Sequence, residues 1–386
     1  MSLDTLPYEM FQFITSPLAK RDLLSLCLVN KKLLPFAQPL LFRTVILIIS
    51  APWYQEYNRS ESQNSYERAR NCFFRTLSTL PSFAFSIASL SLKFDLLSFN
   101  DSPRVPLTIS LLQNAINLRH LYLDGYISQE GCLPSEVIDV VPSTLRSLEI
   151  GTKVLDQAGL QRILARLISL ESLDLSKTRL IGQQTISNAV VLSGKLARLR
   201  FPQTDVEWSP FFDSIVLKAS KSLESFEGPF VSVHALSATD FPVLDELRLI
   251  CGLKDINGEW ESGASAYQEE SQPFFRDLRL TLSKTPQLQR LEFKIDYCTG
   301  PKLHPVTNIS LFDLMPSSIR HIDFRGPSLF PPEALLRFLA STSASINLRS
   351  LEVWRFGSNE EALEDQVEEL CEMREIQLKW RLWNFD

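Results

Sequence analysis

The segment Leu118-Arg-His-Leu-Tyr-Leu123 carries the pattern that decides the fold of this chain. Apolar residues stand at its first, fourth and sixth positions, which gives Leu-x-x-Leu-x-Leu, with Ile, Phe or Val as substitutes. Copies begin at Ile87, Leu118, Leu145, Leu170, Leu196, Leu244, Leu288, Ile319 and Leu348, and a degenerate copy without its third apolar residue begins at Leu223. Successive copies start 21 to 44 residues apart, so the pattern repeats over most of the 386 residues.

The last two apolar positions of each copy alternate with polar ones, which predicts a short strand with one buried face. Helical segments such as 158–167 and 332–339 follow these strands and return the chain on the other side. This pattern and its spacing are typical of leucine-rich repeats, in which parallel strands stack and their leucines form a continuous core. The sequence therefore predicts an α/β fold with a curved solenoid that carries parallel strands on its concave face.

The organisation of the chain follows from where the pattern holds. We expect a helical domain over 1–50, a linker with a leading helix over 51–86, and the solenoid over 87–386. A Gly-, Ser- and acid-rich stretch at about 252–272 indicates an inserted loop, either tolerated or used for binding. The segment at about 358–386 predicts a cap with a helix, whose apolar face holds Ala362, Val367, Leu370 and Met373, and a last strand over 376–380.

Composition excludes several classes of protein. With 45% hydrophobic and 22% charged residues, the chain has enough apolar surface for a core, and it has no apolar run long enough to span a bilayer. The net charge of −6 gives no electrostatic reason to bind nucleic acid or a membrane surface. No secretory signal is recognisable at the N-terminus, so we expect a cytoplasmic or nuclear protein.

Signatures of catalysis and metal binding do not occur in the sequence. No GxSxG, HExxH, GxGxxG or P-loop motif is present, and the six cysteines form no CxxC pair. His120 and His321 are expected seven strand spacings apart, which keeps these two histidines too far from each other for a dyad. We therefore expect no catalytic residue, no metal site and no cofactor.

Three short helices are expected within residues 3–45. Pro7 fits the first turn of one helix, Asp22 is a good N-cap for the second, and the third runs through 33–43. They carry more large apolar residues than about 45 residues can bury, and that surplus predicts a partner surface.

This region resembles an F-box. The resemblance is carried by Leu6-Pro-Tyr-Glu9, Asp22-Leu-Leu24, Leu28-Val-Asn-Lys-Lys32 and Pro39-Leu-Leu-Phe-Arg43, placed directly before the repeats as in fungal F-box proteins with leucine-rich repeats. It implies that the three-helix F-box docks a Skp-type adaptor and, through it, a cullin. Its adaptor-binding residues would be Leu6, Pro7, Glu9, Met10, Leu23, Leu24, Leu28 and Val29. The alternative is an unrelated three-helix cap on the solenoid.

Target binding is expected on the outward side of the strands. There the residue between the last two apolar positions is acidic in most copies, as in Glu149 and Asp174. An acidic stripe with basic interruptions suits a basic or mixed-charge segment, although such acids are also ordinary solvated strand residues. The candidate target-binding residues are Arg198, Arg200, Arg248, Arg290, His321, Arg325 and Trp354.

Together these features predict the substrate-recognition subunit of a cullin–RING (SCF-type) ubiquitin ligase, a non-catalytic chain that binds an unknown target protein. The alternative is a leucine-rich-repeat scaffold that acts outside a ubiquitin ligase.

Overall fold

The computed structural model describes residues 10, 14–15, 18–29, 33–49, 68, 70–76, 81–94, 105–125, 135–152, 154–181, 192, 195–201, 210–229, 232–252, 276–296, 312, 315–325, 332–341, 346–354 and 361–381. The chain divides into two compact units. Unit 1 comprises Met1–Leu170 and Thr178–Gln183, and unit 2 comprises Glu171–Lys177 and Gln184–Asp386. Of the predicted loop at about 252–272, only Gly252 lies among the described residues.

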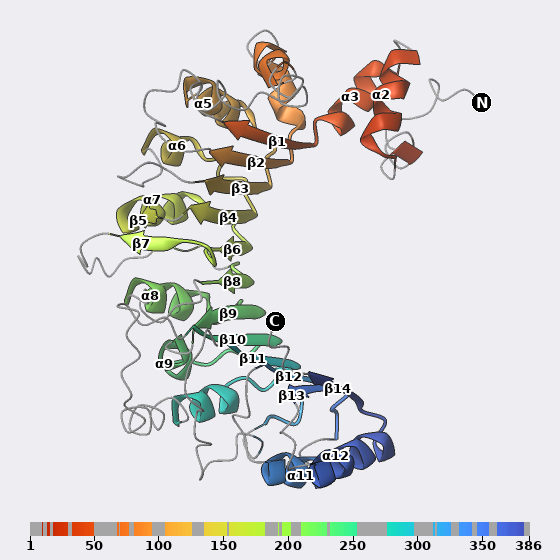
Figure 1. The fold of residues 1–386 in the computed structure, drawn as a ribbon. Helices are drawn as coiled ribbons and strands as arrows, with labels where there is room; N and C mark the ends of the chain where they lie inside the picture. The colour runs from red at the N-terminus through yellow and green to blue at the C-terminus, as the bar shows by residue number, and fades with distance from the viewer. Residues whose placement is uncertain are drawn as a thin grey trace, which may run out of the picture. The chain divides into compact units, whose positions relative to one another are not determined.

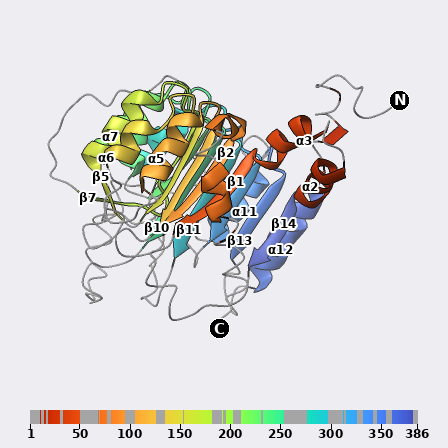
Figure 2. The same ribbon diagram turned by 90° about the horizontal axis from the view of Figure 1, so that it is seen from above.

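Unit 1 contains a pair of helices followed by parallel strands. Its elements are α2 (Lys20–Val29), α3 (Leu34–Leu41), β1 (Thr44–Ile49), the 3-10 helix η3 (Pro81–Ser86), β2 (Ser89–Phe94), α5 (Val105–Asn114), β3 (His120–Gly125), α6 (Ser135–Val140), β4 (Ser147–Thr152), β5 (Val154–Asp156), α7 (Gln157–Arg166) and β7 (Arg179–Ile181). The strands lie in the order β1-β2-β3-β4, and β5 pairs separately with β7. Helices α5, α6 and α7 lie side by side along these strands (Figures 1 and 2).

Unit 2 repeats the same strand–helix alternation. Its elements are β6 (Ser172–Asp174), β8 (Arg198–Arg200), α8 (Pro210–Ala219), β9 (Ser225–Pro229), α9 (Val233–Ser237), β10 (Glu246–Gly252), a helix over residues 276–283, β11 (Arg290–Asp296), β12 (His321–Arg325), α11 (Pro332–Ala340), β13 (Ser350–Trp354), α12 (Glu361–Met373) and β14 (Gln377–Arg381). The strands follow the order β6-β8-β9-β10-β11-β12-β13-β14, and each pairing reported between them is parallel. An open α/β architecture of stacked parallel strands is therefore confirmed.

The leucines of the repeat form the core, as predicted. Leu90 aligns with Leu121 and Leu121 with Leu148, and the side chains of all three are almost fully buried. The same alignment continues in unit 2, where Leu247 pairs with Leu291. A single repeat cannot bury its own apolar residues, and stacking on the next repeat removes them from water.

The strand array begins one strand earlier than the leucine pattern indicates. Residues 44–49, assigned from the sequence to the helical domain, form β1, which pairs in parallel with β2. Val45 lies opposite Leu90 and Leu47 opposite Leu92, so Phe42-x-x-Val-x-Leu47 is a disguised copy of the repeat. The copy was missed because residues 42–47 continue directly from the third expected helix and were assigned with it to the helical domain.

Polar side chains at the turns tie consecutive repeats together. Asn117 donates from Nδ2 to the carbonyl of Phe85 at 2.8 Å, and Asn347 donates in the same way to Ser317 at 2.7 Å. Both asparagines stand immediately before the first Leu of their repeats. Each bond satisfies a turn carbonyl that the strand pairing leaves without a partner.

The degenerate copy at Leu223 is confirmed as a strand, β9, with Gly228 at the third apolar position. The ring of Phe226 occupies the space of the missing side chain. A Cβ added to Gly228 would lie 2.8 Å from Cζ of Phe226, a distance that real Cβ atoms do not show.

The C-terminal cap is confirmed in outline and corrected in detail. Helix α12 and strand β14 both form, and β14 extends the sheet by pairing with β13. The buried face of α12, however, holds Glu364, Val367 and Cys371, whereas Ala362 and Met373 are exposed. The predicted face was rotated because a sequence pattern favours apolar residues, whereas the structure buries Glu364.

Candidate docking surfaces

Helices α2 and α3 pack against each other through a small apolar contact. Leu33 and Ala37 are buried, and Leu26 packs against them. Leu23 is buried too. The opposite side of α2 has no such cover, because the side chain of Leu24 is 51% exposed and that of Leu28 is 79% exposed.

The other residues suggested by the F-box resemblance fall in different places. Met10 is exposed, while Leu6, Pro7 and Glu9 lie outside the described residues, as does the side chain of Val29. Leu23 is buried. The surface available to a partner therefore comes from Met10, Leu24 and Leu28. Ile14 and Leu18, which are not among the adaptor-binding residues that the resemblance implies, are also exposed.

An aromatic cluster attaches the helix pair to the strands of unit 1. The ring of Phe42, which follows α3, lies 6.1 Å from that of Phe73 and 5.6 Å from that of Phe83 between centroids. Lys20 at the start of α2 donates to the carbonyl of Thr44 at 2.8 Å. These contacts fix the helix pair to β1 and η3.

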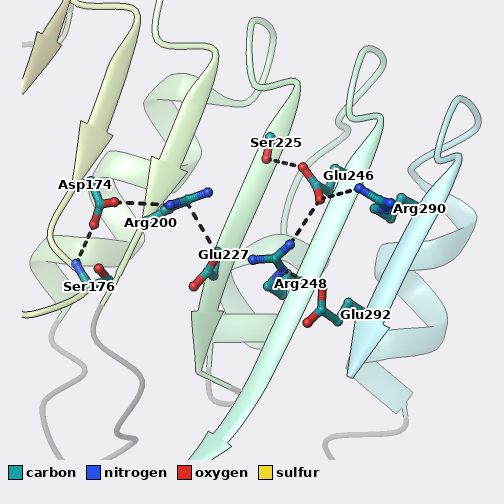
Figure 3. A network of polar contacts seen from close by, with 9 residues as sticks. All are labelled: Asp174, Ser176, Arg200, Ser225, Glu227, Glu246, Arg248, Arg290 and Glu292. Atoms are coloured by element: carbon teal, nitrogen blue, oxygen red, sulfur yellow. Dashed lines mark hydrogen bonds and ion pairs between the residues drawn. The ribbon is translucent and has the colours of Figure 1, made fainter. Parts of the chain in front are cut away.

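The outward side of unit 2 carries a row of alternating charge, shown in Figure 3. We name it the charge ladder. It consists of Asp174, Arg200, Glu227, Arg248 and Glu292, one residue from each of β6, β8, β9, β10 and β11, aligned by the strand register.

Each arginine of the charge ladder bridges the carboxylates on either side. Arg200 lies 3.4 Å from Asp174 and 3.5 Å from Glu227. Arg248 is held more closely, 3.0 Å from Glu227 and 2.7 Å from Glu292. Because Glu227 and Glu292 are buried, neither is the solvated strand residue that the sequence suggested.

A second contact runs beside the charge ladder. Glu246 accepts a hydrogen bond from the hydroxyl of Ser225 at 3.0 Å and lies 3.5 Å from Arg248 and 3.7 Å from Arg290. Glu246 was not among the candidate residues predicted from the sequence. It stands directly before the second Leu of its repeat, as Arg290 does in the next repeat, and this shared position could have indicated that the two residues lie side by side.

From β6 to β11, arginines of the chain itself therefore neutralise the acidic stripe. The candidates Arg200 and Arg248 are engaged with carboxylates of the chain, and Arg290 lies at the outer limit of an ion pair. Arg198 on β8 is exposed, and within the part of the chain that the structure describes its side chain makes no ion pair or hydrogen bond, although its backbone N–H donates to the carbonyl of Glu171 at 3.0 Å.

The remaining candidates lie on the C-terminal strands. Nδ1 of His321 is 2.8 Å from the hydroxyl of Ser350, and the pKa of His321 is lowered by burial and by the neighbouring Arg290 and Arg320. Arg325 and Trp354 end β12 and β13, but their side chains lie outside the described residues.

The last strand continues the alternation of charge. Glu352 on β13 pairs with Lys379 at 3.1 Å and with Arg381, and both cations belong to β14. Sequence reasoning treated the acidic end of the chain as a polar cap, and these two bases of the cap compensate an acid of the neighbouring repeat.

The titratable side chains of the described residues do not gather into a metal site. No cluster of three or more His, Cys, Asp or Glu residues there is arranged to hold a metal ion. Nδ1 of His234 lies 3.0 Å from Asp277, but the imidazole is exposed on the outer side of the repeats. Within the described ranges, no helix combines the length and apolarity needed to cross a bilayer.

Comparison with known proteins does not assign this chain to a family. No family model and no curated protein matches this chain. Among solved structures, it is similar to a protein of Bacteroides fragilis, with a TM-score of 0.32 and 11% identity over 85% of this chain and 74% of that one. A likeness at this level carries no argument about fold or function.

Proposed function

We propose that this protein is the substrate-recognition subunit of a cullin–RING (SCF-type) ubiquitin ligase. The observation that carries the proposal is the uncovered side of α2, where Leu24 and Leu28 remain exposed although α2 is packed against α3. Adjacent exposed leucines on a helix are costly in water and are typical of a surface that a partner covers. The F-box-like sequence around them supports a Skp-type adaptor as that partner.

In this proposal the chain supplies no reacting group. The helical domain over 1–50 binds the adaptor, and the repeats form a curved solenoid whose outward strand face binds a target protein. Holding a lysine of the target near the ubiquitin thioester turns a chance encounter into an effectively intramolecular reaction. Such a complex would work in the cytoplasm or nucleus.

Within unit 2, binding of a target is expected away from the charge ladder. The charges of Arg200 and Arg248 are already compensated, and a target that broke these pairs would take the arginine charge away from the buried carboxylates of Glu227 and Glu292. Exposed Arg198 is better placed, as are the C-terminal positions of Arg325 and Trp354, residue types that often dominate interfaces.

The test of adaptor docking is a binding measurement with a recombinant Skp-type adaptor. Leu24→Asp places a charge in the proposed interface and is expected to weaken binding by at least about a hundredfold, since an unpaired buried charge costs several kcal/mol. Leu217→Asp, at an exposed leucine of α8, is the matched control and leaves binding unchanged. Wild-type affinity in a folded Leu24→Asp variant would contradict the proposal.

A scaffold that acts outside a ligase uses the same helical surface and is the alternative function. Affinity purification from cell extract separates the two if adaptor and cullin are scored independently. Recovery of both supports the ligase, whereas recovery of the adaptor with no cullin supports the scaffold.

A further inference from the structure

Unit 1 exposes a row of apolar side chains at the turns that lead into its strands. In each repeat the residue two places before the first apolar position occupies this turn. It is Phe85 before β2, Ile116 before β3, Ser143 before β4, and Ile168 in the next repeat. The three apolar side chains, which we name the turn row, are 43%, 52% and 68% exposed in that order.

The core does not use the turn row. Two residues further along the chain, Ile87, Leu118 and Leu170 fill the interior and are almost completely buried. The backbone of the turn row is already engaged, because the carbonyl of Phe85 accepts from Asn117 and that of Ile116 accepts from Thr144 Oγ1 at 2.8 Å. Only the side chains remain uncommitted, and they contact water.

The turn itself does not require an apolar residue. Unit 2 has Gly194, Lys221, Pro242, Pro286 and Ser317 at this position of the sequence, and Ile346 is the exception. The apolar turns are thus concentrated in the unit that contains the helix pair. Local folding does not explain that concentration, because the same turn forms in both units with polar residues or proline.

The turn row follows the helix pair along the chain. Leu40 of α3, which is half-buried and is not part of the turn row, stands at the equivalent position two residues before Phe42, the first position of the disguised repeat copy. In Figure 1, α3 leads directly into the start of β1, which places α2 and α3 on the side of unit 1 where strands begin. The turns of the following repeats line this same side.

We propose that the turn row is a second contact of the adaptor that docks on α2, and this inference rests on the proposed function. An apolar surface of the adaptor packs against Phe85, Ile116 and Ile168 while the exposed leucines of α2 bind elsewhere on the same partner. Two contacts on one unit fix the orientation of the repeats relative to the adaptor, which a single pair of helices joined through Phe42 does less rigidly. A fixed orientation is what a substrate receptor needs in order to present a lysine.

The affinity of the full-length protein for a recombinant Skp-type adaptor tests this inference. The double variant Phe85→Ser/Ile116→Ser is expected to bind at least about tenfold more weakly than the wild type. Ile346→Ser, at the same turn position in unit 2, is expected to bind normally. Wild-type affinity in the double variant, together with loss of binding in Leu24→Asp, overturns the turn row as a contact and leaves the proposed function intact. Absence of binding by the wild type overturns both.

A second measurement does not depend on the folding of the double variant. A photoreactive benzoyl-phenylalanine in place of Ile116 is expected to cross-link to the adaptor, and the same group in place of Ile346 is not. Cross-linking at position 116 to a second copy of this chain, or no cross-link to a bound adaptor, refutes the inference.

Discussion

Replacement of Arg248 by Met is expected to destabilise unit 2 far more than the same replacement of Arg200, the other arginine of the charge ladder. Arg248 lies 3.0 Å from Glu227 and 2.7 Å from Glu292, and the side chains of these two acids are only 11% and 6% exposed. Methionine preserves most of the volume and removes the charge, so two carboxylates lose a buried counter-ion at once. Breaking a buried ion pair from one side costs about 3–5 kcal/mol, because an uncompensated charge stays in the interior.

The matched control is Arg200→Met one strand away. Arg200 contacts Asp174 and Glu227 at 3.4 and 3.5 Å, but its own side chain is 54% exposed, against 28% for Arg248. Water and salt screen such a pair, so its loss is expected to cost less than about 1 kcal/mol. The difference between the two variants isolates the effect of burial, since both replace an arginine that bridges two acids.

Urea unfolding followed by circular dichroism measures the free energy of unfolding of both variants, and thermal unfolding measures their melting temperatures. In a unit of this size, a loss of 1 kcal/mol lowers the melting temperature by roughly 2–4 °C. Melting temperatures should therefore fall by about 6–20 °C for Arg248→Met and by less than about 4 °C for Arg200→Met. The loss in Arg248→Met persists in high salt. Addition of Glu227→Gln and Glu292→Gln to Arg248→Met recovers part of the stability, because the two buried carboxylates that Arg248 compensated are then neutral. Equal losses in the two single variants, or no recovery in the triple variant, would refute the reasoning.

Three smaller effects follow from other contacts. Gly228→Ala forces a methyl group to within 2.8 Å of the Phe226 ring and should cost about 1–3 kcal/mol in thermal unfolding. The methyl group of Gly151→Ala meets the ends of two side chains, Asp124 Oδ1 at 3.1 Å and the hydroxyl of Tyr122 at 3.3 Å, and should cost less. Asn117→Ala removes the bond to the Phe85 carbonyl and should cost about 0.5–1.5 kcal/mol in the same assay, and the absence of any loss would show that water replaces it. The lowered pKa of His321 means that the unfolded chain binds a proton there more readily than the folded one. Stability should therefore fall as the pH drops below the ordinary value of 6.5, and His321→Gln should lose less between pH 7.5 and pH 5.5 than the wild type.

The sequence alone determined the elements whose signal is local. The spacing of leucines predicted strands such as β3 and β4 because each strand must present two alternating apolar residues to the core. It also predicted α7 and α11 within a residue or so at each end, since the helical period of apolar residues is read within one segment. The surplus of apolar residues before position 43 was likewise visible in composition, although only the structure separates buried Leu23 from exposed Leu24.

The tertiary structure decided what depends on residues far apart in the chain. Phe42-x-x-Val-x-Leu47 became recognisable as a repeat only when β1 was seen to pair with β2, since alternation of two apolar residues alone does not define a partner strand. The charge ladder joins residues that lie 21 to 44 positions apart, and no local pattern shows that Arg248 stands between Glu227 and Glu292. Seen along the sequence these acids suggested a surface for a basic target, whereas the strand register brings a counter-ion from the neighbouring repeat to each of them. Register is a property of the stacked repeats, so the charge that remains available for binding is set by tertiary structure and not by composition.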